Sequence, residues 1–353
     1  MAVCNRLQYN GRVHNTDKER DIMKKIINDP KNVVNEMVSG LVRAYPQYLQ
    51  KIEGTEAMVR SNEASMVDKV GIISGGGSGH EPAHAGFVGP GMLSGAIAGQ
   101  VFTSPTPDQI YEAIKAANHG KGVFCVVKNY SGDIMNFDMA KELAEIDDIE
   151  VKMVVVDDDI AVEDSLYTQG KRGVAGTIFM HKIVGAAADQ GATLAEIDAL
   201  AQKVMPNIKT IAVALSGATV PEVGKPGFEL ADDEIEYGVG IHGEPGYRRE
   251  KLKPSKELVQ ELLSKLKNAF GMKPDDKYAV LVNGMGATPL MEQYVFMNDT
   301  LDQLADEKVE VAFTKVGNYM TSLEMAGISL TLFKIEDDEW LSYLNYTVDT
   351  IAW

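Results

Sequence analysis

The sequence contains few cysteines and no long hydrophobic run. Cys4 and Cys125 are the only cysteines among 353 residues, too few for a secreted disulfide framework or a cysteine-based metal cluster. No segment approaches the roughly 20 consecutive apolar residues of a membrane-spanning helix. Residues 1–20 are polar and lack the apolar stretch of an export signal. These absences predict a cytoplasmic protein that does not enter a membrane.

Basic residues are also scarce. Lysine and arginine number 34 against 51 aspartates and glutamates, which gives a net charge of −17. A surface of this charge repels a phosphate backbone, and no basic cluster in the chain offsets the repulsion. The composition therefore argues against binding to nucleic acid.

Hydrophobic residues make up 45% of the chain, enough at this length to fill the cores of two α/β domains. We expect an N-terminal extension at residues 1–22, a first α/β domain at 23–206 and a second, smaller α/β domain at 207–353. No low-complexity linker separates the two domains, so we expect them to pack tightly.

Short apolar runs in the first domain predict buried strands at residues 70–74, 122–128 and 151–156. Helical spacing of apolar residues predicts one or two helices within 23–49, and further helices at 107–118, 136–146, 177–190 and 194–204. Buried strands that alternate with helices indicate a three-layer domain with a parallel sheet, in which ligands bind at the carboxyl ends of the strands. In the second domain we expect a mixed sheet, with strands at 209–215, 278–282 and 329–335 and a helix at 255–270.

Two glycine-rich segments, residues 75–82 and 240–246, each contain one histidine near their centre. Glycine has no Cβ and tolerates positive φ, so such segments can bring backbone amides close to a small polar ligand. The two histidines, His80 and His242, can act there as acid, base or nucleophile near neutral pH.

The first glycine-rich segment does not fit three familiar motifs. It lacks the Lys-Ser/Thr ending of a nucleotide-binding P-loop, and His80 occupies the position of the third glycine in the dinucleotide fingerprint. His80 and His84 match the spelling of a zinc-protease motif, His-Glu-x-x-His. Pro82 fits only the first turn of a helix, so His80 would lie before the helix and the two histidines could not share a zinc ion.

Each histidine has a structural alternative to a functional role. His80 is either a cap for the following helix or a proton-transfer group beside a ligand held by the amides of Gly77, Ser78 and Gly79. His242 is either a nucleophile towards a substrate carbonyl or a solvated turn residue. His84 lies on the expected helix, where a structural role is favoured.

Acidic residues follow two of the predicted strands. Lys128 and Asp133 lie at the end of one strand, where Asp133 could accept a hydroxyl proton during phosphoryl transfer or simply form a salt bridge with the lysine. Asp157, Asp158 and Asp159 follow the next strand. Consecutive acidic residues at such a place are more often the start of a solvated loop than a magnesium site, so we predict no metal in this chain.

Taken together, the segments resemble the K subunit of bacterial dihydroxyacetone kinases that use phosphoenolpyruvate as phosphate source. The resemblance covers nearly the whole chain from Met23, and it depends on the shared order and spacing of its motifs rather than on any one of them. The matching segments are residues 74–82, 91–94, 102–108, 128–137, 156–159, 173–176, 238–246 and 283–290.

This resemblance implies that His242 binds the ketone carbon of dihydroxyacetone covalently as a hemiaminal. It implies that Gly77, Ser78, Gly79, His80, Lys128 and Asp133 contact the triose, with His80 and Asp133 in acid and base steps. Only a ketone can form the adduct, so the covalent bond would distinguish dihydroxyacetone from glycerol.

The resemblance also implies partners. Nothing here resembles a nucleotide site, and the printed sequence ends at Trp353 without the further helical domain of single-chain, ATP-dependent relatives. We therefore expect a separate L subunit that carries ADP and magnesium, an M subunit of the phosphotransferase system that recharges it, and a homodimer of this chain. The main alternative is a dihydroxyacetone sensor that activates a transcription factor; a fatty-acid-binding relative is disfavoured, because such a pocket needs neither a nucleophilic histidine nor the Lys128–Asp133 pair.

Overall fold

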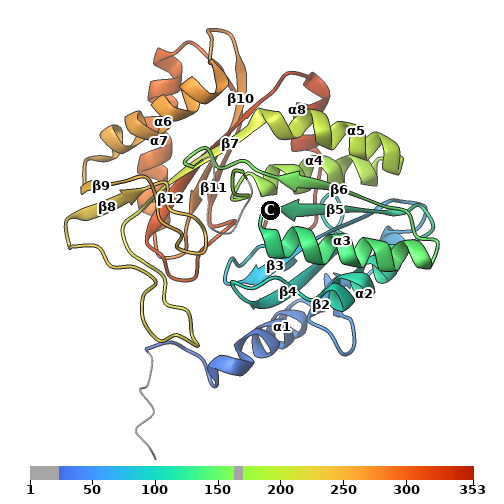
Figure 1. The fold of residues 1–353 in the computed structure, drawn as a ribbon. Helices are drawn as coiled ribbons and strands as arrows, with labels where there is room; N and C mark the ends of the chain where they lie inside the picture. Colours follow the sequence, from blue (N-terminus) through green and yellow to red (C-terminus); the bar gives the residue numbers. More distant parts are fainter. Residues whose placement is uncertain (1–23, 163–169) are drawn as a thin grey trace, which may run out of the picture.

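The computed structural model describes residues 24–162 and 170–353, so the predicted extension at residues 1–22 lies outside the described residues. The described chain forms two six-stranded sheets with helices around and between them (Figure 1). The first sheet has the strand order β1-β2-β4-β3-β5-β6. Its strands are β1 (Leu49–Lys51), β2 (Ala57–Arg60), β3 (Gly71–Ser78), β4 (Gly95–Val101), β5 (Val123–Lys128) and β6 (Val151–Val156).

Strands β3 to β6 are parallel, whereas β1 and β2 form an antiparallel edge beside β4. The helices around this sheet are α1 (Val33–Ala44), α2 (Pro107–Ala117), α3 (Ser131–Ile146), α4 (Thr177–Asp189) and α5 (Leu194–Val204). Helices α2 and α3 cover one face of the sheet and α1, α4 and α5 the other. Successive strand side chains point to opposite faces, so Phe124 packs with α4 while Cys125 packs with α2 and α3.

The second sheet has the order β11-β10-β12-β7-β8-β9 and is mixed, because only the β10–β11 pair is parallel. Its strands are β7 (Ile208–Ala214), β8 (Glu234–Tyr237), β9 (Arg248–Lys251), β10 (Lys277–Gly284), β11 (Glu310–Gly317) and β12 (Gly327–Lys334). The remaining α-helices are α6 (Ser255–Phe270), α7 (Leu290–Asp306) and α8 (Asp338–Asn345), and short 3₁₀ helices lie at Pro30–Asn32, Glu63–Ser65, Ala85–Phe87 and Met205–Asn207. Helices α6 and α7 cover the outer face of this sheet.

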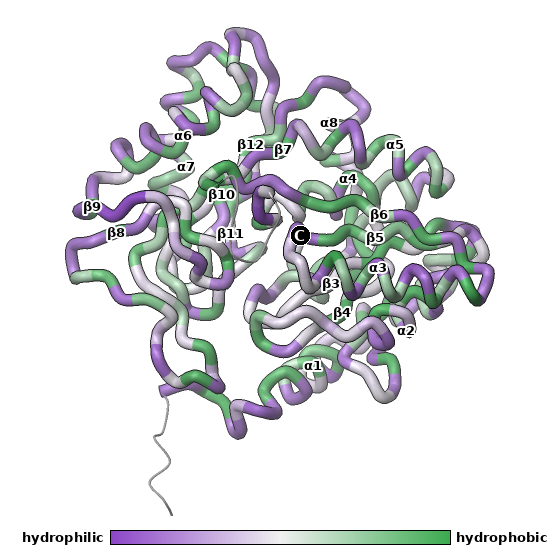
Figure 2. Tube along the Cα trace, in the orientation of Figure 1, coloured by the Kyte–Doolittle hydropathy of each residue, from purple (hydrophilic) through white to green (hydrophobic). Residues whose placement is uncertain are grey.

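The largest hydrophobic core lies between the two sheets and is shared by them. Helix α4 is buried along nearly its whole length, and its Phe179 packs against Phe333 of β12 with 5.7 Å between ring centroids. In Figure 2 the neighbouring strands β5 and β6 are mostly hydrophobic, whereas the outer helix α6 alternates hydrophobic with hydrophilic residues. A helix that is apolar on all sides needs neighbours on all sides, which explains why α4 holds the two sheets together.

The last residues of the chain return to the first sheet. The amide of Ala352 donates a hydrogen bond to the Gly86 carbonyl (2.9 Å), and the amide of Asp349 donates one to the Pro90 carbonyl (3.0 Å). The Trp353 ring stacks on Phe313 of β11 with 6.0 Å between centroids. These contacts tie the turn after β3 to the second sheet.

The predicted α/β class, with two sheets, is confirmed. Several details differ from the sequence predictions: residues 75–78 extend β3 rather than forming a loop, and a turn with a 3₁₀ helix follows Pro82 where we expected an α-helix. Helix α3 begins five residues earlier than predicted, at Ser131. The single α-helix within 24–49, α1, agrees with the predicted one or two. The glycines fit the strand because the sheet is crowded there; a Cβ at Gly75 would lie 2.8 Å from the Ile97 carbonyl oxygen. The domain boundaries stay a prediction.

Candidate active site

A polar cavity of about 510 Å³ opens at the carboxyl ends of β3 and β5. It is lined by Gly77, Phe102, Thr103, Ser104, Tyr130, Ser131, Gly132, Asp133 and His242. All of these except His242 belong to the first sheet and its loops, and His242 comes from the loop after β8 of the second sheet. The two predicted histidine segments therefore meet at one cavity rather than forming two.

The ring of His242 is oriented by Glu244. The Glu244 carboxylate accepts hydrogen bonds from His242 Nδ1 at 3.0 Å and from the His242 amide at 2.8 Å. Burial opposes the ionised form of Glu244, but His242 and Arg172 outweigh it and lower the Glu244 pKa to about 2. An ionised Glu244 holds the proton on Nδ1, so the other ring nitrogen, Nε2, is the atom available for chemistry.

His80 lies directly behind His242 and is fully buried. Its Nδ1 donates to the Thr321 carbonyl (2.7 Å), and its Nε2 is 3.1 Å from His242 Nε2. Both Nδ1 atoms are committed as donors, so this Nε2–Nε2 hydrogen bond requires one further proton shared by the two rings. Burial and the neighbouring His242 hold the pKa of His80 well below its usual range.

Asp133 and Lys128 form the second half of the site. The Ser104 hydroxyl donates a hydrogen bond to Asp133 Oδ1, and Asp133 Oδ2 lies 3.7 Å from Lys128 Nζ. Asp133 lines the cavity, whereas Lys128 is fully buried behind it. Burial lowers the Lys128 pKa, although Asp133 opposes that shift. Asp133 is therefore the group that can reach a ligand proton, with Lys128 supporting its charge.

The three residues predicted as amide donors occupy different positions. Gly77 lines the cavity. The Ser78 hydroxyl donates to the Gly99 carbonyl at 2.7 Å, and the Gly79 amide donates to the Glu81 carboxylate at 3.1 Å. Gly79 adopts φ of 105°, which favours glycine. Of the three, only Gly77 lies where it can contact a ligand in the cavity without rearrangement.

Three aromatic and polar residues complete the site, and the sequence analysis gave none of them a role. The Tyr130 ring packs edge-on against His242 with centroids 4.6 Å apart, and its buried hydroxyl has no hydrogen-bond partner among the described residues. The Phe102 ring stacks on His80 at 5.2 Å. Glu244 follows His242 by two residues within the same glycine-rich segment, and Tyr130 lies between Lys128 and Asp133, so proximity in sequence was the available signal.

The consecutive acidic residues 157–159 have structural partners. Asp158 is buried and accepts hydrogen bonds from the Val174 and Gly176 amides, both at 2.7 Å. Asp159 forms an ion pair with Arg172 at 2.6 Å, and Asp157 is exposed. Within residues 24–162 and 170–353, no three His, Cys, Asp or Glu side chains are arranged to hold a metal ion. No helix in the same ranges is long and apolar enough to cross a membrane.

The fold and the site define an α/β protein with a cavity at the carboxyl ends of β3 and β5, in which a histidine from one sheet faces a carboxylate from the other. A family model described as the Dak1 domain matches residues 39–352. The chain belongs to this family.

Two curated relatives cover almost the entire chain. The "PTS-dependent dihydroxyacetone kinase, dihydroxyacetone-binding subunit DhaK" of Lactococcus lactis subsp. lactis (strain IL1403) is 62% identical over 330 residues, covering 94% of this chain and 99% of that protein. The "DhaKLM operon coactivator DhaQ" of the same strain is 44% identical over 333 residues, covering 93% and 100%. The solved dihydroxyacetone kinase of C. freundii is similar in fold, with a TM-score of 0.86 at 33% identity, over 94% of this chain and 60% of that one.

Proposed function

We propose that this chain is the dihydroxyacetone-binding subunit of a phosphoenolpyruvate-dependent dihydroxyacetone kinase, a phosphotransferase. The observation that carries the proposal is the pairing of His242 with Asp133 across one cavity. His242 offers a nucleophilic nitrogen and Asp133 a base, which are the two groups that capture of a ketone and transfer to its hydroxyl require. The 62% identity to a subunit of that name supports the same assignment.

The first step is covalent capture. The proton shared by the two Nε2 atoms moves onto His80 across the 3.1 Å hydrogen bond, which frees the Nε2 lone pair of His242 to attack the ketone carbon. The former carbonyl oxygen then accepts this proton from His80, so the hemiaminal carries a neutral hydroxyl. The alkylated ring retains its Nδ1 proton and one positive charge, which the Glu244 carboxylate stabilises at 3.0 Å.

The second step is phosphoryl transfer to a terminal hydroxyl of the captured triose. Asp133 accepts the hydroxyl proton as the oxygen attacks the phosphorus, a contribution of typically 10²–10⁴ in rate. The Ser104 hydroxyl holds one carboxylate oxygen of Asp133, and the Lys128 ammonium lies near the other. The covalent bond to His242 fixes the hydroxyl for this attack before the phosphoryl donor arrives.

The donor would come from a partner protein. We propose an L subunit that carries the nucleotide and magnesium, recharged by an M subunit of the phosphotransferase system, and a homodimer of this chain. An exposed apolar stripe on α3 supports docking of a protein on this helix. The first turn of α3 carries Asp133, so a protein docked there would lie beside the cavity. The stripe consists of Met135, Met139, Leu143 and Ile146, with 40% to 78% of each side chain exposed.

A reconstituted reaction tests this proposal. The protein is mixed with dihydroxyacetone and an ATP-charged L subunit, and dihydroxyacetone phosphate is followed over time. We expect catalytic turnover that depends on both proteins. Adduct formation without turnover would instead favour a sensor, the function that the name of the 44% identical coactivator gives to that relative. The higher identity to the kinase subunit, together with the presence of both His80 and Asp133, favours the kinase.

A further inference from the structure

The ammonium of Lys128 is held in the protein interior by more than its neighbour Asp133. Lys128 is fully buried, and its Nζ atom lies 3.1 Å from His84 Nε2 and 3.5 Å from the Gly75 carbonyl oxygen. A lysine ammonium can only donate hydrogen bonds. His84 Nε2 must therefore be an unprotonated acceptor, and the single proton of the His84 ring is on Nδ1.

The atoms on the other side of His84 confirm this protonation state independently. The Ser74 hydroxyl donates its hydrogen to the Val126 carbonyl at 2.7 Å, so towards His84 Nδ1, 3.3 Å away, it can only accept. His181 Nε2 lies 2.9 Å from the same Nδ1. The Nδ1–H of His84 is thus shared between two acceptors. Each proton in the series of hydrogen bonds from Lys128 through His84 to His181 is therefore assigned to one atom.

The series of hydrogen bonds that begins at Lys128 ends at His181, on α4. Since His181 Nε2 accepts, its own proton is on Nδ1, and that buried nitrogen has no hydrogen-bond partner among the described residues. An unsatisfied buried N–H costs free energy. The protein keeps this histidine nonetheless, and His181 has no contact with the cavity. A role through His84 and Lys128 accounts for its presence.

We infer that His84 and His181 are positioning residues: as a neutral pair with fixed tautomers, they supply the acceptor that keeps Lys128 charged and aimed at Asp133. The inference rests on the proposed function, in which Lys128 supports the Asp133 base. A protonated His84 would turn an N–H towards the ammonium and repel it. Burial, reinforced by the charge of Lys128, holds the pKa of His84 well below its usual range, and burial lowers the pKa of His181 to about 3. The pair is therefore neutral throughout the physiological range.

The titratable groups that face Lys128 are Asp133 on α3, His80 after β3, His84 before the 3₁₀ helix and His181 on α4. Asp133 favours the ammonium by its charge. Of the histidines, only His84 has a ring nitrogen within hydrogen-bond distance of Nζ. Removing that acceptor should lower the pH at which Lys128 loses its proton, because a hydrogen bond to the charged form is lost.

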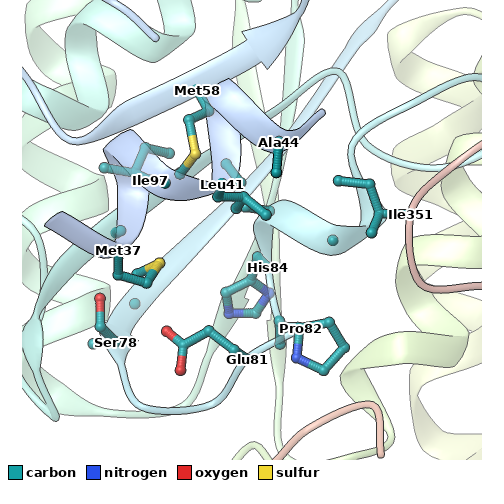
Figure 3. A pocket seen from close by; sticks show the side chains of 18 of the residues that line it. Met37, Leu41, Ala44, Met58, Ser78, Glu81, Pro82, His84, Ile97 and Ile351 are labelled. Carbon is teal, nitrogen blue, oxygen red and sulfur yellow. The ribbon is translucent and has the colours of Figure 1, made fainter. Parts of the chain in front are cut away.

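His84 also lines a second cavity, of about 380 Å³, between α1 and the first sheet (Figure 3). Figure 3 shows its ring beneath Leu41 of α1, with Glu81 and Pro82 nearby. Truncation of His84 to alanine would open this cavity towards Lys128 and let water replace the lost acceptor. The informative variants therefore keep the volume: His84→Leu removes the acceptor, and His84→Gln offers a side-chain oxygen in its place.

The test follows phosphoryl transfer from pH 6 to pH 10 in the wild type and in the two variants. We expect the alkaline limb of the profile to move to lower pH by about one unit in His84→Leu, so that transfer at pH 9 falls several-fold, and at most about ten-fold, more than at pH 7. The His84→Gln variant should return to within about three-fold of the wild type at both pH values. His181→Phe, one step further along the chain, should shift the limb in the same direction but less, because Ser74 still accepts from His84.

Identical pH profiles in His84→Leu and the wild type would overturn the inference. A His84→Gln variant whose rate of phosphoryl transfer does not exceed that of His84→Leu at any pH would also overturn it. A second readout keeps it independent of turnover. Side-chain NMR of ¹⁵N-lysine-labelled protein, with the Lys128 signal assigned from Lys128→Arg, reports the titration of Nζ directly. A lowered midpoint in His84→Leu would support the inference even in a protein without kinase activity, and an unchanged midpoint would refute it.

Discussion

At the scale of single residues, the site depends on where a few protons lie. The hydrogen bonds of Glu244 and Thr321 commit the Nδ1 protons of His242 and His80. The two Nε2 atoms then face each other at 3.1 Å with one proton between them. This arrangement gives His242 a lone pair only when His80 takes that proton, which gives the buried His80 a role behind the histidine that lines the cavity.

The carboxylate of Glu244 should matter for capture more than for folding. We expect Glu244→Gln to reduce the fraction of protein carrying the triose adduct by roughly 10- to 100-fold, since a hydrogen bond to a charged group contributes about 1.5–3 kcal/mol. Titration with dihydroxyacetone measures this fraction. Glu236→Gln is the matched control, because Glu236 is equally buried but pairs with Arg249 outside the cavity. Equal losses in both variants would contradict the role of Glu244.

The Tyr130 hydroxyl is buried at the cavity without a partner among the described residues, so we expect it to bind a triose hydroxyl. Tyr130→Phe should weaken triose binding by about ten-fold while leaving the thermal unfolding midpoint unchanged or slightly higher, because an unsatisfied buried hydroxyl is removed. Calorimetric titration and thermal unfolding measure the two effects. A variant that binds the triose as tightly as the wild type would show that the hydroxyl does not touch it.

At the scale of elements, strand β3 leaves room for the site because its glycines have no side chains. A Cβ at Gly76 would overlap Lys128 Nζ, so Gly76→Ala should displace the ammonium and reduce phosphoryl transfer by at least ten-fold with the fold intact. Gly40→Ala on α1 is the control, because a Cβ there meets nothing within 4 Å and should stabilise the helix by about 0.5–1 kcal/mol. Steady-state kinetics and urea unfolding of both variants test the contrast. Unimpaired transfer in Gly76→Ala would contradict the packing argument.

Much of the architecture could be predicted from periodicity. The strands β5 and β6 and the helices α2, α5 and α6 were located from their apolar spacing, because burial on a known face leaves a regular pattern. Strand β4 (Gly95–Val101), the edge strand β1 and its neighbour β2 were missed, since strands that are short or rich in glycine carry little pattern. The end of β3 was read as a loop, because glycine favours loops until the packing of a neighbouring strand excludes every larger residue.

The predicted site residues could be found where chemistry and sequence spacing coincide. His80, Asp133 and His242 lie within short polar segments at strand ends, and the structure places Asp133 and His242 at one cavity with His80 buried behind His242. The partners Thr321 and His181 could not be found, because they approach from positions 241 and 97 residues away from His80 and His84. Only the folded chain brings such residues together, and a single sequence carries no signal of it.

At the scale of the whole molecule, buried neutral histidines should make the fold sensitive to acid. The pKa of His181 is about 3 in the folded chain against 6.5 for a free histidine, so the unfolded state binds one more proton throughout that window and stability falls as the pH falls. The slope for one such group is about 1.4 kcal/mol per pH unit. Asp158, whose burial raises its pKa to about 6, acts in the opposite sense between pH 3.8 and 6.

Comparison with His181→Phe isolates the histidine. Between pH 6.5 and pH 5 the variant should lose about 1.6 kcal/mol less unfolding free energy than the wild type, because it has one fewer group to protonate on unfolding. Urea unfolding at the two pH values gives this difference. Parallel losses in the two proteins would mean that His181 is not buried in its neutral form.

Covalent capture on His242 is the claim on which the proposed function depends most. The direct measurement is ¹³C NMR of dihydroxyacetone labelled at C2, bound to the wild type, to His242→Ala and to Asp133→Asn. We predict that the ketone signal is replaced by that of a tetrahedral carbon in the wild type and in Asp133→Asn, and that His242→Ala shows only the ketone. A tetrahedral signal of undiminished intensity in His242→Ala would contradict the assignment.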